Sequence, residues 1–189
     1  YDGSVFDGNY KAGLAHGSGT EKFTSGEIHY GEYHNGELHG DEITKIFKDG
    51  SKEVGPYKFG VKHGKHTITD QDGYFEESEF RDGLMNGISM ISWPQGDKVR
   101  STYKDGFKHG SEIYYFINGD TEQCSYKEGR VSGDCLYYDS ENNLIEVCAY
   151  EQNALIGCQD DSNVTTKMDK MSERLFGIVK DAAELVTGQ

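Results

Sequence analysis

Residues 103–110 read Tyr-Lys-Asp-Gly-Phe-Lys-His-Gly, and this short stretch sets the pattern of most of the chain. An aromatic residue, Tyr103, is followed by glycine after three positions (Gly106) and again after seven (Gly110). The same frame recurs at Tyr10/Gly13/Gly17, Tyr33/Gly36/Gly40, Tyr57/Gly60/Gly64, Phe80/Gly83/Gly87 and Tyr126/Gly129/Gly133, with a divergent copy at Tyr150/Asn153/Gly157. Successive aromatics lie 23 or 24 residues apart, which indicates a repeat array of about seven copies.

Two turn signals in each repeat predict its local structure. Asn-Gly or Asp-Gly pairs, which favour tight hairpin turns, recur near the third position after the aromatic and again near the sixteenth. Examples of the first kind are 35–36 and 105–106, and examples of the second are 49–50 and 118–119. The segments between them, such as 113–117, are rich in aromatic and β-branched residues that suit strands. Each repeat is therefore predicted to form one β-hairpin.

Stacked hairpins predict an all-β fold, a single elongated and twisted antiparallel sheet. Antiparallel strands lie about 4.8 Å apart, so seven hairpins would span roughly 65–70 Å. The step from Tyr33 to Tyr57 is one residue longer than most others. We expect a β-bulge between Thr44 and Phe47 to hold the extra residue.

Composition limits the kinds of partner. The chain has 189 residues, of which 34% are hydrophobic, and its 33 acidic and 19 basic residues give a net charge of −14. This charge repels nucleic acid and anionic lipid headgroups, so we expect no nucleic-acid partner and only indirect contact with a membrane. Nothing in the sequence excludes a homodimer. The chain starts without methionine and residues 2–8 read as the end of an earlier repeat, so we expect a piece of a longer protein.

The frame Tyr-x-x-Gly-x-x-His-Gly, with glycine two residues before the aromatic in the early copies, resembles the MORN repeat family over residues 1–158. Later copies depart from it, with Ser78, Ser101, Cys124 and Cys148 at the preceding glycine position and Ser132 and Ile156 at the histidine position. The resemblance implies a role in cytoskeletal, ciliary or membrane-cortex assemblies. It also implies two alternatives, peripheral phospholipid binding and a regulatory repeat region of a larger enzyme such as a lysine methyltransferase or phosphoinositide kinase.

The sequence changes character after the repeats. A polar linker, 159–163, is followed by an amphipathic segment, 164–189, predicted to form an α-helix. Its apolar residues are spaced by three and four: Met168, Met171, Leu175, Ile178, Ala182 and Leu185. We expect this helix to pack on a face or an end of the sheet, although its spacing also suits a short coiled coil.

Four of the seven histidines could suggest a metal site, but they occupy the same position in different repeats: His16, His39, His63 and His109. Equivalent positions in neighbouring repeats lie about 10 Å apart, which is too far for one zinc ion with bonds of about 2.1 Å. We therefore predict no metal and no cofactor, and expect these histidines to stabilise turns.

The four cysteines match no metal or redox spacing motif. If the hairpins turn near Arg130, Glu141 and Asn153, the cysteines face one another in a row across four strands: Cys124, Cys135, Cys148 and Cys158. We interpret them as small residues in a crowded row, with a regulatory disulfide as the alternative.

No catalytic motif occurs, and we predict a non-catalytic scaffold or protein-interaction module with no catalytic residues. The repeats place one aromatic residue each in a stripe beside small residues, which would form an apolar groove for an extended or helical partner segment. The candidate partner-binding residues are Tyr10, Tyr33, Tyr57, Phe80, Tyr103, Tyr126 and Tyr150.

Overall fold

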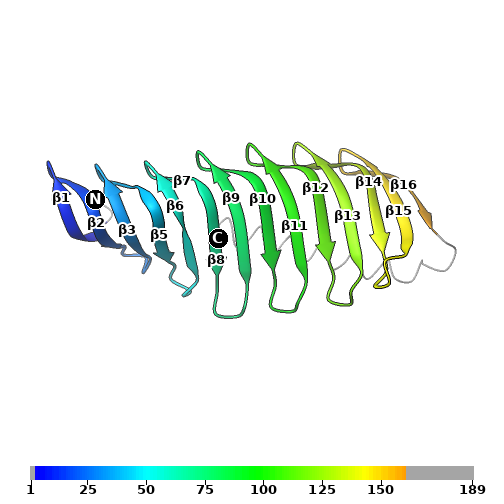
Figure 1. The fold of residues 1–189 in the computed structure, drawn as a ribbon, viewed down its shortest axis with the longest axis horizontal. Coiled ribbons are helices and arrows are strands. Elements are labelled where there is room, and N and C mark those ends of the chain that lie inside the picture. Colours follow the sequence, from blue (N-terminus) through cyan, green and yellow to red (C-terminus); the bar gives the residue numbers. More distant parts are fainter. Residues whose placement is uncertain (1–2, 161–189) are drawn as a thin grey trace.

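A computed structural model describes residues 3–160, which form one long antiparallel β-sheet (Figure 1). The sheet contains sixteen strands, and two of them, β4 and β7, are short pieces that branch from the main path. The strands are β1 (Val5–Lys11), β2 (Leu14–Lys22), β3 (Ile28–His34), β4 (Glu37–Leu38), β5 (Gly40–Ile46), β6 (Lys52–Lys58), β7 (Val61–Lys62), β8 (Gly64–Thr69), β9 (Phe75–Arg81), β10 (Leu84–Ser92), β11 (Lys98–Lys104), β12 (Phe107–Tyr115), β13 (Thr121–Lys127), β14 (Arg130–Tyr138), β15 (Leu144–Glu151) and β16 (Ala154–Asp160).

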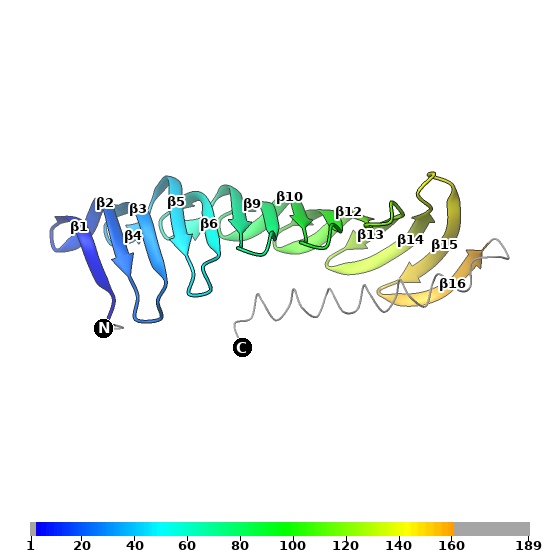
Figure 2. The ribbon, with the colours of Figure 1, turned by 90° about the horizontal axis from the view of Figure 1, so that it is seen from below.

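The strands follow one another in space as they do in sequence. Apart from β4 and β7, which pair with β3 and β6, the strands pair in chain order, with β1 and β16 at the two ends of the described sheet. Seen from below, the sheet is a twisted and elongated ribbon (Figure 2). The predicted single antiparallel sheet of hairpins is therefore confirmed. β16 continues through the first two residues of the expected linker, and the predicted helix 164–189 lies outside the described residues.

In each repeat, a tight turn follows the strand that carries the repeat's aromatic residue and joins it to the next strand. At the centre of these turns, two successive residues have positive φ, for example 51° at Asp105 and 86° at Gly106. This is the pattern of a type I′ turn, whose twist matches that of the strands it joins. The same pair of positive angles occurs at 12–13, 35–36, 59–60, 82–83, 128–129 and 152–153.

These turns also connect each repeat to the one before it. The backbone N–H of Gly106 donates to the carbonyl of Met85 in the preceding repeat, at 2.9 Å. Equivalent bonds run from Gly36 to Ala15, Gly60 to Leu38, Gly83 to Lys62, Gly129 to Lys108 and Asn153 to Val131. The first glycine after the aromatic, represented by Gly106, therefore adopts the turn conformation and connects the turn to the preceding repeat by a hydrogen bond.

Replacing Gly106 by valine is expected to cost about 1–3 kcal/mol, because a β-branched residue is strained at positive φ. Replacing it by asparagine should cost less than about 1 kcal/mol, since asparagine tolerates this region. Asn153 already holds the equivalent position with φ of 73°. Urea unfolding followed by circular dichroism measures both variants, and equal losses would contradict the turn assignment.

The second glycine after the aromatic, represented by Gly110, lies in a β-bulge. In the hairpin of β11 and β12, Ser101 pairs with Glu112 and Tyr103 with Lys108, so two steps on one strand face four on the other. Gly110 lies in this bulge with φ of 93°, a value that favours glycine.

The extra residue of the longest early repeat lies elsewhere than expected. In β5 the register shifts between Gly40, which pairs with Tyr57, and Ile43, which pairs with Gly55. The predicted bulge between Thr44 and Phe47 is therefore wrong. The extra residue adds to the bulge that the repeat already uses, where the strand ladder is interrupted, and leaves the pairing of residues 43–46 regular.

Polar side chains at the histidine position lie against the next repeat's turn. The Nδ1 atom of His39 accepts a hydrogen bond from the backbone N–H of Phe59, at 3.3 Å. In a later repeat, Asn86 donates from its amide to the carboxylate of Asp105, at 3.1 Å. The expected turn-stabilising role is thus found for His39.

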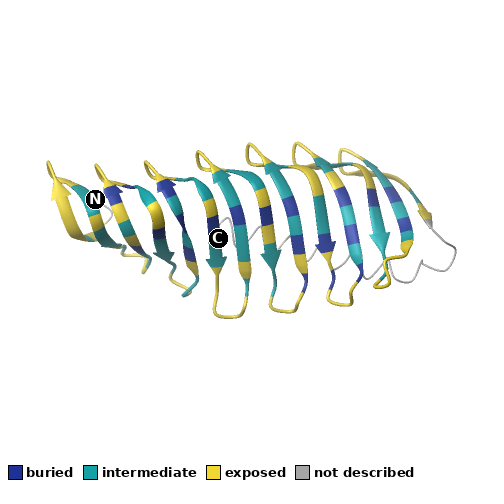
Figure 3. Cartoon of the chain, in the orientation of Figure 1, coloured by how far each residue is buried: buried dark blue, intermediate teal, exposed yellow. Residues whose placement is uncertain are grey.

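The buried residues gather along the middle of the strands, whereas the turns at both edges are exposed (Figure 3). Two apolar clusters are formed, one around Tyr33, Leu38, Ile43 and Tyr57 and the other around Val99, Tyr114 and Phe116. Both lie on the face that carries the aromatic residues of the repeats.

Candidate partner-binding face

Side chains alternate between the two faces of a strand, so residues two apart share a face. The face that carries the repeat aromatics has three parallel rows, which run across the strands. The aromatic row contains Tyr10, Tyr33, Tyr57, Phe80, Tyr103, Tyr126 and Tyr150. Two residues earlier on the same strands lies the central row, Gly8, Gly31, Gly55, Ser78, Ser101, Cys124 and Cys148, and two residues earlier again lies the outer row, Phe6, His29, Glu53, Glu76, Val99, Glu122 and Glu146.

The aromatic row is exposed to different degrees along the sheet. Tyr10, at one end, is 60% exposed, whereas Tyr33 and Tyr57 are only 4% and 3% exposed. The four later members, Phe80, Tyr103, Tyr126 and Tyr150, are half-buried. Tyr10 and these four can therefore meet a partner, while Tyr33 and Tyr57 belong to the core.

The space beside the early aromatics is filled by side chains of the neighbouring strands. A Cβ atom added to Gly19 would lie 2.2 Å from the ring of Phe6, and one added to Gly31 would lie 2.4 Å from Cδ1 of Ile43. At Gly55 the added atom would lie 2.5 Å from the ring of His66. The expected groove of small residues is thus occupied in this half of the sheet, because each glycine makes room for a larger residue opposite.

A network of charged and polar groups lies at the centre of this half. The carboxylate of Glu53 accepts hydrogen bonds from the Tyr57 hydroxyl at 2.6 Å and from Lys62 at 2.6 Å, and the Nδ1 atom of His66 lies 3.2 Å from it. The other ring nitrogen of His66 lies 2.8 Å from the carbonyl oxygen of Pro56. Both ring nitrogens of His66 therefore face oxygen atoms of the neighbouring strand.

The environment of Glu53 favours its charged form. Burial alone would raise the pKa of this carboxyl, but the hydrogen bond from His66 and the nearby ammonium of Lys62 outweigh it and lower the pKa to about 2. Burial and the Glu53 carboxylate together raise the pKa of the Tyr57 hydroxyl well above its usual range. The network is therefore a structural unit in which one carboxylate serves three donors.

Lysine side chains cover several of the aromatic rings. The ammonium of Lys62 lies 4.9 Å from the ring centre of Phe80, and that of Lys108 lies 5.0 Å from the ring centre of Tyr126. Cation–π contacts of this kind contribute about 0.5–2 kcal/mol. A partner that approaches these rings must either displace the lysines or bind beside them.

The later part of the face is rich in carboxylates. Glu112 accepts a hydrogen bond from Ser101 at 2.6 Å and also pairs with Lys108. Burial raises the pKa of Glu122 to about 7. Glu146 is 3% exposed. Buried carboxyl groups thus recur along this end of the face, and burial disfavours the charged form of Glu122.

The cysteines face one another as predicted, because Cys135 is the register partner of both Cys124 and Cys148, and Cys148 also pairs with Cys158. They form two disulfides, Cys124–Cys135 and Cys148–Cys158. The favoured interpretation as merely small residues is therefore wrong, and the alternative of disulfide pairing is observed. Cross-strand neighbours on one face are close enough for a disulfide where the local ladder brings them together, here with Cα atoms 4.2 Å and 4.0 Å apart.

The charged network around Glu53 was missed by sequence reasoning. Glu53 and His66 are thirteen residues apart and neither belongs to the recurring frame. The sequence feature that could have indicated it is Gly55 in the central row. A residue without a side chain at this position leaves room for a larger one, His66, on the neighbouring strand.

Comparison with known families agrees with the repeat pattern. A model of the MORN repeat matches residues 6–28, 77–98 and 101–121. The chain is a MORN-repeat protein. The matched stretches contain the copies at Tyr10, Phe80 and Tyr103, and the total of about seven repeats stays a prediction from the frame.

A comparison with curated proteins found no match. Among solved structures, similar chains include the TCP domain of SAS-4 (dCPAP) of Drosophila melanogaster, in complex with a proline-rich motif of Ana2 (dSTIL). It has 10% identity, a TM-score of 0.45 and coverage of 83% of this MORN-repeat chain and 88% of that chain. The E1021V mutant of the TCP10 domain of Danio rerio CPAP has 19% identity, a TM-score of 0.28 and coverage of 76% and 77%. These TM-scores are too low for either domain to indicate what the present chain binds.

Proposed function

We propose that this MORN-repeat chain is a non-catalytic scaffold that binds an extended or helical protein segment along its aromatic face. The observation that carries the proposal is the line of half-buried aromatics, Phe80, Tyr103, Tyr126 and Tyr150, which runs across strands β9 to β15 on one face. Aromatic side chains with a buried body and an accessible edge are typical anchors of protein interfaces. The sheet presents such an anchor once in every hairpin, which suits a partner that runs along it.

The charge of the face favours a protein partner over a membrane. The carboxylates of Glu76 and Glu112 lie near Tyr103 of the aromatic row, and the whole chain has a net charge of −14. Anionic lipid headgroups and nucleic acid are repelled by such a surface, whereas a segment that carries lysine or arginine is attracted. The described residues contain no helix long and apolar enough to cross a membrane. Association with the cytoskeleton or the membrane cortex, which MORN repeats suggest, is then reached through the protein partner.

A pair of matched double variants tests the proposal. Tyr103→Ser with Tyr126→Ser removes two anchors from the aromatic face. Tyr30→Ser with Tyr115→Ser removes two tyrosines of 39% and 40% exposure from the opposite face. Loss of two interface anchors is expected to lower the capture of a bound protein at least about tenfold, and the control variant should leave it unchanged.

The measurement is quantitative mass spectrometry of proteins retained by each immobilised variant, after circular dichroism has shown that both keep the β-sheet signal. Equal capture by both double variants would overturn the proposed face. Flotation with vesicles of phosphatidylserine and phosphatidylcholine at physiological salt tests the lipid alternative. Binding of the isolated chain to these vesicles would replace the scaffold proposal with a peripheral membrane function.

A further inference from the structure

The end of the sheet formed by β13–β16 carries the same group of side chains twice. Each group has two cysteines on adjacent strands and a glutamate two residues before the first cysteine. The first thiol cluster is Glu122, Cys124 and Cys135, and the second thiol cluster is Glu146, Cys148 and Cys158. In each cluster the three potential ligand atoms lie within 4.8 Å of one another.

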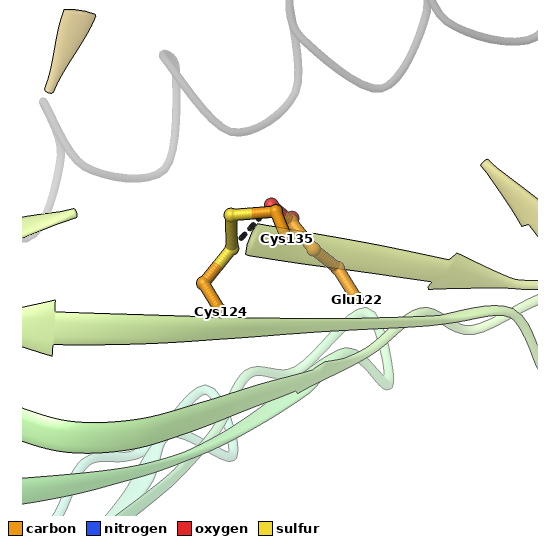
Figure 4. A group of neighbouring side chains, drawn as sticks. All are labelled: Glu122, Cys124 and Cys135. Atoms are coloured by element: carbon orange, nitrogen blue, oxygen red, sulfur yellow. Dashed lines mark hydrogen bonds between the residues drawn. A yellow bond between two sulfur atoms is a disulfide. The ribbon is translucent and has the colours of Figure 1, made fainter. Parts of the chain in front are cut away.

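Figure 4 shows the first thiol cluster, with the carboxylate of Glu122 directed at the two sulfur atoms. Its Oε1 atom lies 3.1 Å from Sγ of Cys124, and the Glu122 residue is only 8% exposed. Cys135 is 2% exposed, and in the second thiol cluster Glu146 and Cys148 are 3% and 1% exposed. Both clusters thus place a carboxylate beside sulfur in a shielded position on the same face.

We propose that, once the two disulfides are reduced, each thiol cluster binds one thiophilic divalent ion of the zinc type. Two thiolates and one carboxylate are a donor set that zinc accepts, and a fourth, open position suits a water molecule. The disulfide and the metal exclude each other, because both use the same sulfur atoms. Oxidation therefore releases the ion and reduction restores the site.

The chemistry balances with a dithiol reductant. One thiolate of the reductant attacks a cysteine sulfur, the protein S–S bond breaks, and a mixed disulfide forms. The second thiol of the reductant displaces the remaining protein sulfur, so the reductant leaves as a disulfide and the protein holds two thiols. When the ion binds, both thiols release their protons to solvent, and two metal–sulfur bonds and one metal–oxygen bond form.

The geometry excludes one ion shared by all four cysteines. Neighbouring strands lie about 4.8 Å apart, so Cys124 and Cys158, on strands three steps apart, are separated by about 14 Å. A zinc–sulfur bond is about 2.3 Å, and a single ion therefore cannot reach all four sulfurs. Two sites, each on one pair of adjacent strands, satisfy the distances with the strand pairing that the sheet already has.

Titration of the reduced full chain with cobalt(II), in the absence of oxygen, tests the proposal. The expected result is two ions per chain, seen as thiolate-to-cobalt absorption that zinc then abolishes, and no such absorption with the oxidised chain. Cys124→Ser with Cys135→Ser should leave one ion per chain. Glu122→Gln should weaken the first site at least about tenfold, because even outer contacts of a metal site change affinity by that much.

Glu76→Gln is the matched control, since Glu76 holds the same repeat position but has Ser78 in place of a cysteine. It should leave both sites unchanged. The inference is overturned if the reduced chain binds no cobalt through sulfur, if it binds a single ion, or if Glu122→Gln binds as the parent does. Equal binding by a variant with all four cysteines replaced by serine would assign the ions to histidines and overturn it as well.

Discussion

Glu53→Ala is expected to destabilise the MORN-repeat sheet by about 3–5 kcal/mol, the usual cost of removing one partner from a buried ion pair. Glu53 is 3% exposed and its carboxylate serves Tyr57, Lys62 and His66. Without it, the buried Tyr57 hydroxyl and His66 ring lose their acceptor, and the partly exposed Lys62 loses its ion-pair partner. Urea unfolding followed by circular dichroism gives the change in free energy.

Glu77→Ala is the matched control for this variant. Glu77 pairs with Lys65 at 2.8 Å, but the Lys65 side chain is 56% exposed. Surface pairs contribute about 0–1 kcal/mol, so the control should be nearly neutral. Equal effects of the two replacements would show that the Glu53 network does not stabilise the sheet.

The same network predicts how stability depends on pH. The pKa of Glu53 falls from an ordinary value of 4.5 to about 2 in the folded chain. The folded state therefore favours the deprotonated carboxylate more than the unfolded state does. Its stabilising contribution is fully present above pH 4.5 and is lost as the pH falls through about 2. Between these values the parent should lose stability more steeply than Glu53→Ala.

Gly55→Val is expected to be almost as damaging as Glu53→Ala. The added Cβ would lie 2.5 Å from Cγ and Nδ1 of His66, and this ring is 1% exposed and has no room to move aside. Overpacking costs about 1–3 kcal/mol, and displacing His66 from Glu53 and Pro56 adds the cost of unpaired buried groups. A total above about 3 kcal/mol should appear in the same urea experiment.

Gly157→Val provides the control, because no heavy atom lies within 4 Å of a Cβ added there. The double variant Glu53→Ala with Gly55→Val should cost less than the sum of the single costs, since both act on one network. Additive losses, or equal effects at Gly55 and Gly157, would contradict the packing of His66 against Gly55.

The recurring frame predicts much of this fold because its glycines mark the positions where the backbone needs positive φ. Gly106 has positive φ in a tight turn and Gly110 has positive φ in a bulge, so their spacing encodes a hairpin directly. The same reasoning predicts that the cysteines face one another, because strand register follows from turn positions. Whether facing cysteines are joined depends on redox conditions, which a spacing pattern does not contain.

The candidate site was less predictable, since it depends on side-chain sizes across strands. The glycines of the central row suggested empty space, but Gly31 faces Ile43 and Gly55 faces His66. Further along, Ser78 bonds Ser89 at 2.9 Å, and two pairs of cysteines follow. A small residue on one strand is matched in volume by a larger residue that faces it on the next strand. This pairing is not visible when the sequence of each strand is considered alone.

Site-specific photo-cross-linking tests the scaffold proposal most directly. A benzophenone amino acid is placed at Tyr10 or Phe80 on the aromatic face, and at Tyr30 or Tyr115 on the opposite face, in the full chain within extract of its source cells. The account predicts that one and the same protein is cross-linked from Tyr10 and Phe80 and is absent from the products at Tyr30 and Tyr115. Cross-linking of that protein from the opposite face alone, or from all four positions equally, would contradict it.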